Sequence, residues 1–170
     1  MAREDSAVRL VEALAVRGKT LAAAESCTAG LVADRIASVP GASRVFWGSF
    51  VTYMTDAKAV MLGLDRNMIE KNGAVSGETA RAMAEAALEK SGASLAVSVT
   101  GLAGPSGDGT SVPVGTVWIA TALSGGPSSA RVFRIEGDRE TVRGAAAETA
   151  LREALDRLSL GGIDRKKTDG

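Results

Sequence analysis

Residues Ala24 to Gly30, with the sequence AESCTAG, place nucleophile-capable side chains between an apolar run and an amphipathic one. The run Thr20–Ala24 before this heptapeptide is typical of a short buried strand. After the heptapeptide, apolar side chains recur at helical spacing, at Leu31, Val32, Ile36 and Val39. Ser26 is therefore predicted to lie at a corner where a strand ends and a helix begins.

The backbone of such a corner has a chemistry of its own. The first N–H groups of a helix lack intrahelical partners and lie at the positive end of the helix dipole. Here those groups belong to Thr28, Ala29 and Gly30, and they favour an anion or an oxyanion. Ser26 or Thr28 is equally suited to cap the helix, because Ser and Thr are preferred caps. The residues alone leave both roles open.

The chain contains no histidine, which excludes a Ser-His-Asp triad. The base for a serine nucleophile must then be Lys, Tyr, Asp or Glu. Lys58 is the best candidate, because it opens a helix just after Tyr53 ends the second predicted strand. A lysine accepts a proton only as the free amine, so burial must lower its pKa. Without such an environment Lys58 is an ordinary surface lysine and Tyr53 an ordinary strand aromatic.

Cys27 is an alternative nucleophile beside Ser26. It ranks lower, because a lone cysteine is usually a small buried hydrophobe. As the only cysteine in a chain without histidine, it cannot contribute to the usual zinc or iron–sulfur sets. The sequence therefore predicts no metal and no other cofactor.

Size and charge narrow the function classes. With 170 residues, 45% of them apolar, the chain is predicted to form one domain over residues 1–160, followed by a polar tail at 161–170. Its 20 basic and 20 acidic residues cancel, which disfavours a nucleic-acid partner. No apolar run is long enough for a membrane span, and the acidic start does not fit a signal peptide. A soluble, cytoplasmic protein with no membrane partner is expected.

Periodicity and turn residues predict an alternation of helices and strands. The predicted strands are Thr20–Ala24, Phe46–Tyr53, Leu95–Thr100, Gly115–Ala122 and Ala130–Ile135. The predicted helices span about 8–14, 31–39, 55–61, 65–71, 77–90 and 139–158, with caps at Ser6, Ser76 and Asp138. This order predicts an α/β fold, a three-layer α/β/α sandwich with a mixed, mostly parallel sheet and a C-terminal antiparallel hairpin.

Ligands of such folds bind at the carboxyl ends of the parallel strands. Three polar segments are expected to meet there: residues 25–28, Thr100 with the glycine-rich loop 101–109, and Tyr53. The loop matches neither the Walker nor the dinucleotide spacing, so it is either a ligand loop or a plain turn. Arg139 and Arg143, one turn apart on the last helix, form either a phosphate-binding pair or a solvated face.

These fragments, in this order, resemble the C-terminal domain of the CinA (competence/damage-inducible) family, from about Ser6 to Leu158. Six motifs together carry the resemblance: AESCTAG at 24–30, FVTY at 50–53 with Ala57–Lys58, GAVS at 73–76, TGLAGP at 100–105, PVGTVW at 113–118 and GDR at 137–139.

The resemblance implies an amidase that converts nicotinamide mononucleotide into nicotinic acid mononucleotide and ammonia. It implies a serine nucleophile matching Ser26, a lysine base matching Lys58 and a catalytic tyrosine matching Tyr53. The residues expected to contact the nucleotide substrate are Glu25, Thr28, Ala29, Gly30, Thr100, Gly101, Gly104 and Arg139. A homodimer is the oligomer that the resemblance implies.

Two features depart from the family pattern. Many relatives have a lysine where this chain has Val112, so a substrate contact by that lysine is not expected here. Many also have a larger N-terminal domain, for which 170 residues leave no room. The rival hypothesis is a non-catalytic nucleotide-binding or protein-interaction module of the same fold, in which Ser26 only caps the helix.

Overall fold

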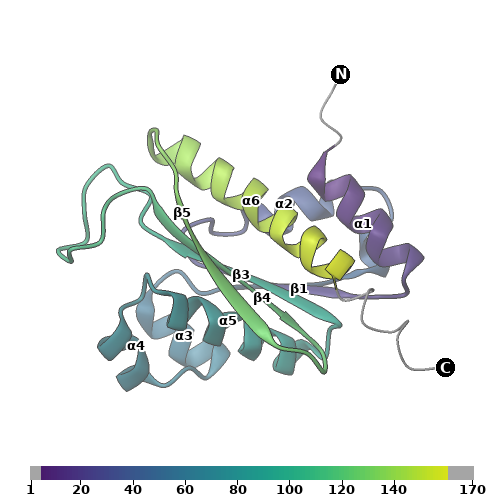
Figure 1. The fold of residues 1–170 in the computed structure, drawn as a ribbon, viewed down its shortest axis with the longest axis horizontal. Coiled ribbons are helices and arrows are strands. Elements are labelled where there is room, and N and C mark those ends of the chain that lie inside the picture. Colours follow the sequence, from purple (N-terminus) through teal and green to yellow (C-terminus); the bar gives the residue numbers. More distant parts are fainter. Residues whose placement is uncertain (1–4, 161–170) are drawn as a thin grey trace.

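Five strands form one mixed sheet in the computed structural model, which describes residues 5–160 (Figure 1). Their order across the sheet is β2-β1-β3-β4-β5. The strands are β1 (Leu21–Glu25), β2 (Phe46–Val51), β3 (Leu95–Gly101), β4 (Thr116–Leu123) and β5 (Ser128–Arg134). Strand β1 runs parallel to β2 and β3, whereas β3–β4 and β4–β5 are antiparallel. The predicted tail at 161–170 lies outside the described residues.

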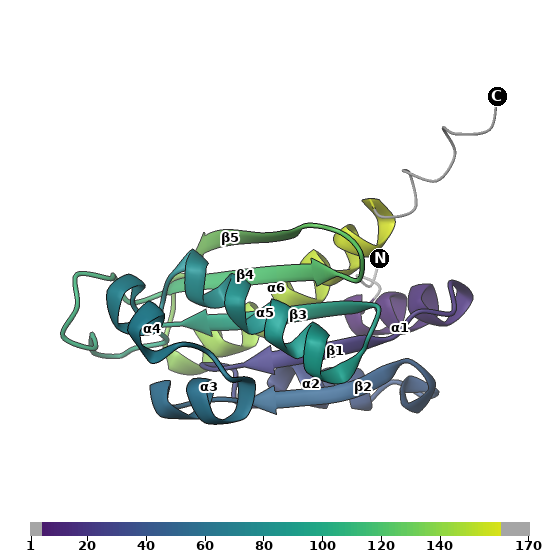
Figure 2. The ribbon, with the colours of Figure 1, turned by 90° about the horizontal axis from the view of Figure 1, so that it is seen from below.

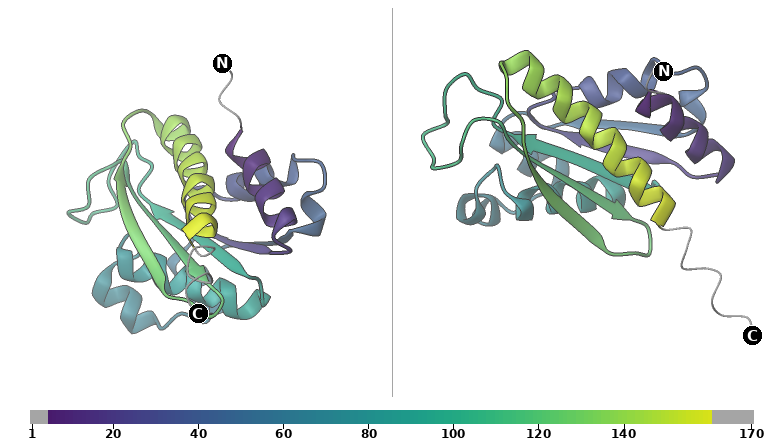
Figure 3. Two further views of the ribbon diagram at one scale, coloured as in Figure 1. Left: turned by 45° about the vertical axis from the view of Figure 1, so that its right-hand side comes forward. Right: turned by 45° about the horizontal axis from the view of Figure 1, so that its top comes forward.

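Helices cover both faces of this sheet. One face carries α1 (Ser6–Val16), α2 (Leu31–Ala37) and α6 (Arg139–Leu160), and the other carries α3 (Thr55–Leu62), α4 (Arg66–Asn72) and α5 (Gly77–Ser91) (Figures 1 and 2). A short 3₁₀ helix, η1 (Ala42–Arg44), precedes β2. In Figure 3, α6 runs along the sheet beside α1. The predicted three-layer sandwich with a C-terminal hairpin is confirmed.

The central strand β3 is buried from both sides, and its alternation assigns a different kind of residue to each face. Leu95, Val97 and Val99 pack in the larger core, under α1, α2 and α6. On the other face, Ala96 packs in the core under α5, and the hydroxyl of Ser98 donates to the carbonyl of Ala80 in α5. Because Ala96 and Ser98 are small, α5 lies close to this face of the sheet.

Two of the three predicted helix caps are confirmed. The Ser76 hydroxyl accepts from the Thr79 N–H at 3.1 Å, and Asp138 accepts from the Thr141 N–H at 2.8 Å. The prediction for Ser6 is wrong, because Asp5 caps α1. The Asp5 carboxylate accepts from the Ala7 N–H at the start of α1. The Ser6 hydroxyl instead donates to Glu148 of α6.

Gly115 is predicted to tolerate no side chain. Its φ is 86°, and an added Cβ would lie 2.2 Å from the carbonyl oxygen of Ile135. We expect Gly115→Ala to lower the free energy of unfolding in urea by about 2–5 kcal/mol, the sum of a positive-φ cost and an overpacking cost. Gly109→Ala is the matched control, because Gly109 has the same φ and no atom within 4 Å of the added Cβ. It should cost only ~1–2 kcal/mol, and equal losses in the two variants would contradict the steric account.

Candidate functional site

Ser26 and Lys58 meet at the carboxyl end of β1. Ser26 follows the last residue of β1, and its N–H donates to the carbonyl of Val99 in β3 at 2.9 Å. Lys58 lies in the first half of α3, the helix that follows β2. Because β1 and β2 are parallel neighbours, their ends adjoin, and the Lys58 Nζ lies 2.9 Å from the Ser26 Oγ.

The surroundings of the Lys58 amine suit a proton acceptor. The side chain is 1% exposed. Besides Ser26, its Nζ contacts the carbonyl oxygens of Thr52 at 2.9 Å and Tyr53 at 3.5 Å. A neutral amine has two N–H bonds and one lone pair. With both N–H bonds directed at the carbonyls, the lone pair faces the Ser26 hydroxyl.

Burial lowers the pKa of Lys58 from 10.5 to about 8, because desolvation penalises the ammonium form. The smaller effect of the nearby Cys27 thiol opposes this shift. In the described part of the chain, no carboxylate forms an ion pair with Lys58. With a pKa near 8, roughly a tenth of the amine is free base at pH 7.

The Tyr53 side chain lies away from this pair. Its ring is 50% exposed, and its hydroxyl contacts the guanidinium of Arg139. Only the backbone carbonyl of Tyr53 reaches Lys58 and Ser26, at 3.5 and 3.4 Å. The structure therefore places the ring of Tyr53, which the resemblance implies to be catalytic, away from Ser26 and Lys58 and beside Arg139.

Glu25, expected to contact the substrate, is fully buried and caps α2 instead. Its carboxylate accepts from the N–H groups of Gly30, Val32 and Ala33 at 2.9–3.0 Å and from the Ser49 hydroxyl at 2.9 Å. A carboxylate satisfies several donors at once and is favoured at the positive end of a helix. All four contacts are internal, so this side chain has a structural role.

This cap overturns the capping interpretation of Ser26 and Thr28. The Ser26 hydroxyl contacts Lys58 and the Tyr53 carbonyl, and the Thr28 hydroxyl has no hydrogen-bond partner. The cap also changes which N–H groups remain free. The Gly30 N–H is bound by Glu25, and the Ala29 N–H donates to the Ser26 carbonyl at 3.1 Å.

Of the three predicted oxyanion donors, only the Thr28 N–H lacks an oxygen acceptor within residues 5–160. The backbone turns sharply here, since Ala29 and Gly30 have φ values of 49° and 101°. Thr28 itself is fully buried. We define residues 26–30 as the nucleophile loop.

The glycine-rich loop meets the site through its backbone. Gly104 accepts from the Arg139 Nη1 at 2.7 Å, and Arg139 in turn reaches Tyr53. Gly101 allows close packing, because an added Cβ would lie 2.9 Å from the Thr116 carbonyl oxygen. The Thr100 side chain is buried and donates to the Ala74 carbonyl at 2.7 Å, away from Ser26.

Arg143 and Arg139 do not form a pair. Arg139 is exposed at the rim of the site. Arg143 is half-buried, and its Nε and Nη2 donate to the carbonyls of Cys27 and Thr28 at 2.9 and 3.0 Å. Sequence reasoning missed this contact, because spacing along α6 gives no sign of which loop lies beside it.

Cys27 is a poorer nucleophile than its position suggests. It is 6% exposed, and burial raises the pKa of its thiol to about 11, although Arg143 and Lys58 partly offset this effect. The thiolate, which is the reactive form, is therefore scarce at neutral pH.

Comparison with known protein families identifies the family to which this chain belongs. The model of the CinA C-terminal domain matches residues 3–158. The chain belongs to the CinA C-terminal domain family. It is similar to a CinA-like protein of Geobacter metallireducens, with 48% identity over 134 residues that cover 79% of this chain and 32% of the relative. It is also 48% identical to a protein of Symbiobacterium thermophilum described as a putative competence-damage inducible protein, over 89% of this chain and 37% of that one.

Solved structures of the CinA superfamily share the fold. One is the competence/damage inducible protein CihA from Agrobacterium tumefaciens, with a TM-score of 0.86, 38% identity, and coverage of 94% of this chain and 98% of that one. Another is a CinA superfamily protein from Klebsiella pneumoniae, with a TM-score of 0.88, 30% identity, and coverage of 91% and 96%. This CinA domain spans about a third of the length of the curated relatives it matches.

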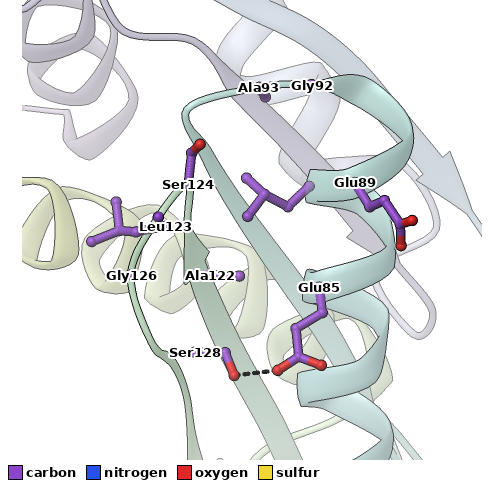
Figure 4. Close-up of a pocket in the computed structure, with 11 residues that line it drawn as sticks. Glu85, Glu89, Gly92, Ala93, Ala122, Leu123, Ser124, Gly126 and Ser128 are labelled. Atoms are coloured by element: carbon purple, nitrogen blue, oxygen red, sulfur yellow. Dashed lines mark hydrogen bonds between the residues drawn. The ribbon is translucent and has the colours of Figure 1, made fainter.

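Two surface grooves of this CinA domain lie away from Ser26. One, of about 350 Å³, lies between the end of α5 and the β4–β5 turn, where Ser128 donates to Glu85 (Figure 4). It adjoins the start of β3, at the opposite end of the sheet from Ser26. The other follows residues 37–46 between α2 and β2.

Within residues 5–160 of the CinA domain, no three His, Cys, Asp or Glu side chains lie together as metal ligands. No helix in the same part of the chain has the length and apolar character to cross a membrane.

Lys58→Met is predicted to stabilise the CinA domain at pH 7. The pKa of Lys58 is about 8 in the folded state, and an unperturbed lysine has a pKa of 10.5, so between these values the folded state binds fewer protons than the unfolded state. Wild-type stability therefore rises with pH through this window, and the full penalty is present below pH 8. We expect the variant to be more stable by about 1–3 kcal/mol at pH 7, with little difference above pH 10.5.

Urea unfolding at a series of pH values measures this difference. Lys71→Met, at an exposed position of α4, is the control and should show no such pH-dependent gain. A Lys58→Met protein that is less stable than wild type at pH 7 would contradict the lowered pKa.

Proposed function

We propose that this CinA domain is an amidohydrolase in which Ser26 is the nucleophile and Lys58 its base. The observation that carries the proposal is the 2.9 Å contact between the Ser26 Oγ and the buried Lys58 Nζ in a chain without histidine. The resemblance to CinA amidases supplies the substrate, the carboxamide of nicotinamide mononucleotide. The products are nicotinic acid mononucleotide and ammonia.

The first half of the reaction forms an acyl-enzyme. The free amine of Lys58 takes the Ser26 proton while the Ser26 Oγ attacks the amide carbon. The tetrahedral intermediate then collapses, and the Lys58 ammonium returns the proton to the leaving nitrogen, which departs as ammonia. The carbonyls of Thr52 and Tyr53 hold the Nζ in both protonation states, because both states keep N–H bonds to donate.

The second half repeats the chemistry with water. Lys58, again the free amine, takes a proton from water, which attacks the acyl carbon and releases the carboxylate product. The final proton transfer restores the Ser26 hydroxyl. No metal or organic cofactor is required by these steps.

The substrate phosphate is assigned to Arg139. Arg139 is exposed at the rim and is tied to both the glycine-rich loop and the Tyr53 hydroxyl. An arginine fork binds phosphate oxygens bidentately. Tyr53 would thereby help place the nucleotide, whereas its carbonyl holds Lys58.

The rival of a non-catalytic module has less support. It required Ser26 to act as a helix cap, and Glu25 caps α2 instead. A buried lysine with no carboxylate partner lowers the stability of a fold. Such a penalty is understandable at a catalytic site, where lowered lysine pKa values are needed.

Substitution of each partner tests the mechanism. We expect Ser26→Ala to abolish ammonia release from nicotinamide mononucleotide without a large change in the thermal midpoint, because the hydroxyl does not cap α2. Lys58→Met and Lys58→Arg should lower kcat by about 10²–10⁴-fold, since neither side chain accepts a proton. In the wild type, kcat/KM should rise with pH along a limb centred near 8, the pKa of Lys58.

The alternative is that Lys58 binds the phosphate as a fixed cation. Lys58→Arg would then raise KM and leave kcat nearly intact, which would sink the serine–lysine mechanism. If Ser26→Ala released ammonia at the wild-type rate, the nucleophile would have to be Cys27 instead. The activity of Cys27→Ser would then test that role.

The homodimer implied by the family stays a prediction, and we propose that it forms through the edge of β2. Residues 45–55, which include β2, carry no charge. Exposed apolar side chains gather on this edge and on α3: Trp47, Val51, Met54, Val60 and Met61. The opposite edge strand, β5, carries Arg131 and Arg134. Charged residues protect an edge from pairing, so only the β2 edge suits a two-fold contact with a second copy.

Val51→Lys is expected to convert the dimer into a monomer in analytical ultracentrifugation. Val132→Lys on β5 is the matched control, because Val132 and Val51 are similarly exposed, at 45% and 39%. It should leave the dimer intact. A monomeric wild type, or a dimer that survives Val51→Lys, would contradict this interface.

A further inference from the structure

Arg143 of α6 binds the backbone of the nucleophile loop. Its Nε donates to the carbonyl of Cys27 at 2.9 Å, and its Nη2 donates to the carbonyl of Thr28 at 3.0 Å. Within residues 5–160 Arg143 forms no ion pair with a carboxylate. Its planar fork is thus committed to two consecutive carbonyls.

These contacts fix the direction of a peptide group beside Ser26. The only cis peptide bond in the described part of the chain is Gly104–Pro105, so the Cys27–Thr28 peptide is trans. In a planar trans peptide, the C=O and the N–H point in opposite directions. Because Arg143 holds the Cys27 carbonyl, the Thr28 N–H points away from Arg143.

Three of the neighbouring N–H groups are already bound. Ser26 donates to Val99, Ala29 donates to the Ser26 carbonyl, and Gly30 donates to Glu25. The N–H groups of Cys27 and Thr28 donate to no oxygen among the described residues. Of these two, only the Thr28 N–H shares a peptide group with a carbonyl that Arg143 holds.

We propose that Arg143 is a positioning residue that aims the Thr28 N–H at the oxyanion formed on Ser26 during acyl transfer. The inference rests on the proposed function for Ser26 as the nucleophile. Glu25 binds the N–H groups at the far end of the loop and Arg143 binds the carbonyls at its near end. Together they hold Ala29 and Gly30 in their left-handed conformations. Arg143 itself touches no reacting atom.

A fluorophosphonate probe tests this role without the nucleotide substrate. The Ser26 Oγ would bond to phosphorus, fluoride would leave, and the Ser26 proton would pass to Lys58. The phosphoryl oxygen develops charge as an amide oxygen does, so an aimed N–H accelerates labelling. The measurement is the second-order rate constant for labelling, with Ser26→Ala as the control for the site.

Arg143→Met should slow labelling by about 10²-fold, the effect of losing one oxyanion donor. Arg143→Lys should lie between Arg143→Met and wild type, because an ammonium can bind these carbonyls but lacks the planar fork. Arg152→Met is the matched control on the same helix, where Arg152 contacts Glu148, and it should label at the wild-type rate. With nicotinamide mononucleotide, Arg143→Met should lower kcat and leave KM within about threefold, the pattern of an interaction made only in the transition state.

Labelling of Arg143→Met at the wild-type rate would overturn the proposal, as would a raised KM with unchanged kcat, which indicates phosphate binding. If Arg143→Met does not fold, a protein with the α-hydroxy acid analogue of Thr28 replaces the N–H by an ester oxygen and keeps Arg143. Slowed labelling of that protein supports the proposal, and unchanged labelling contradicts it. A wild type that labels at Ser26 but releases no ammonia would refute the nucleotide substrate and leave the positioning role standing.

Discussion

The burial of one amine without a countercharge is the constraint on which the rest of the site depends. Lys58 is 1% exposed, and among residues 5–160 its Nζ contacts only the Ser26 hydroxyl and two backbone carbonyls. A carboxylate in this place would hold the ammonium form and raise its pKa. Carbonyls instead satisfy the N–H bonds of either form, so desolvation sets the pKa near 8. The parallel pairing of β1 and β2 makes this arrangement possible, because it brings α3 beside the end of β1.

The other charged side chains close to Ser26, those of Glu25 and Arg143, bind backbone groups. Glu25 binds three N–H groups at the start of α2, which leaves the Ser26 hydroxyl without a capping role. Arg143 binds the carbonyls of Cys27 and Thr28. Two opposite charges thereby stabilise a loop whose left-handed residues would otherwise be strained. The result is a fixed nucleophile beside a lysine of lowered pKa, with the exposed Arg139 at the rim for an anionic group.

Local patterns in the sequence predict most of the fold and the pair formed by Ser26 and Lys58. They do not predict the contacts that support this pair. Strand and helix periods predict the three layers, and the absence of histidine directs attention to Lys58 at the end of the second strand. The resemblance implies that Glu25 contacts the substrate, whereas the structure shows its carboxylate bound to the start of α2. The sequence could not show this, because a carboxylate before a serine does not reveal whether its side chain turns back toward the helix. The contact from Arg143 joins residues 115 or more positions apart. Such contacts depend on how α6 packs across the sheet. The sequence likewise does not reveal that the carbonyl of Tyr53 contacts Lys58 whereas its side chain contacts Arg139.

Direct titration of Lys58 tests the central claim that burial lowers the pKa of its amine to about 8. The ¹³Cε resonance of Lys58 can be assigned by its loss in Lys58→Met and followed by NMR from pH 5 to 11. The account predicts a midpoint near 8, as the buried position requires, well below those of the exposed lysines. A midpoint at the ordinary lysine value of about 10.5 would contradict it, because a permanently charged Lys58 cannot take the proton from Ser26.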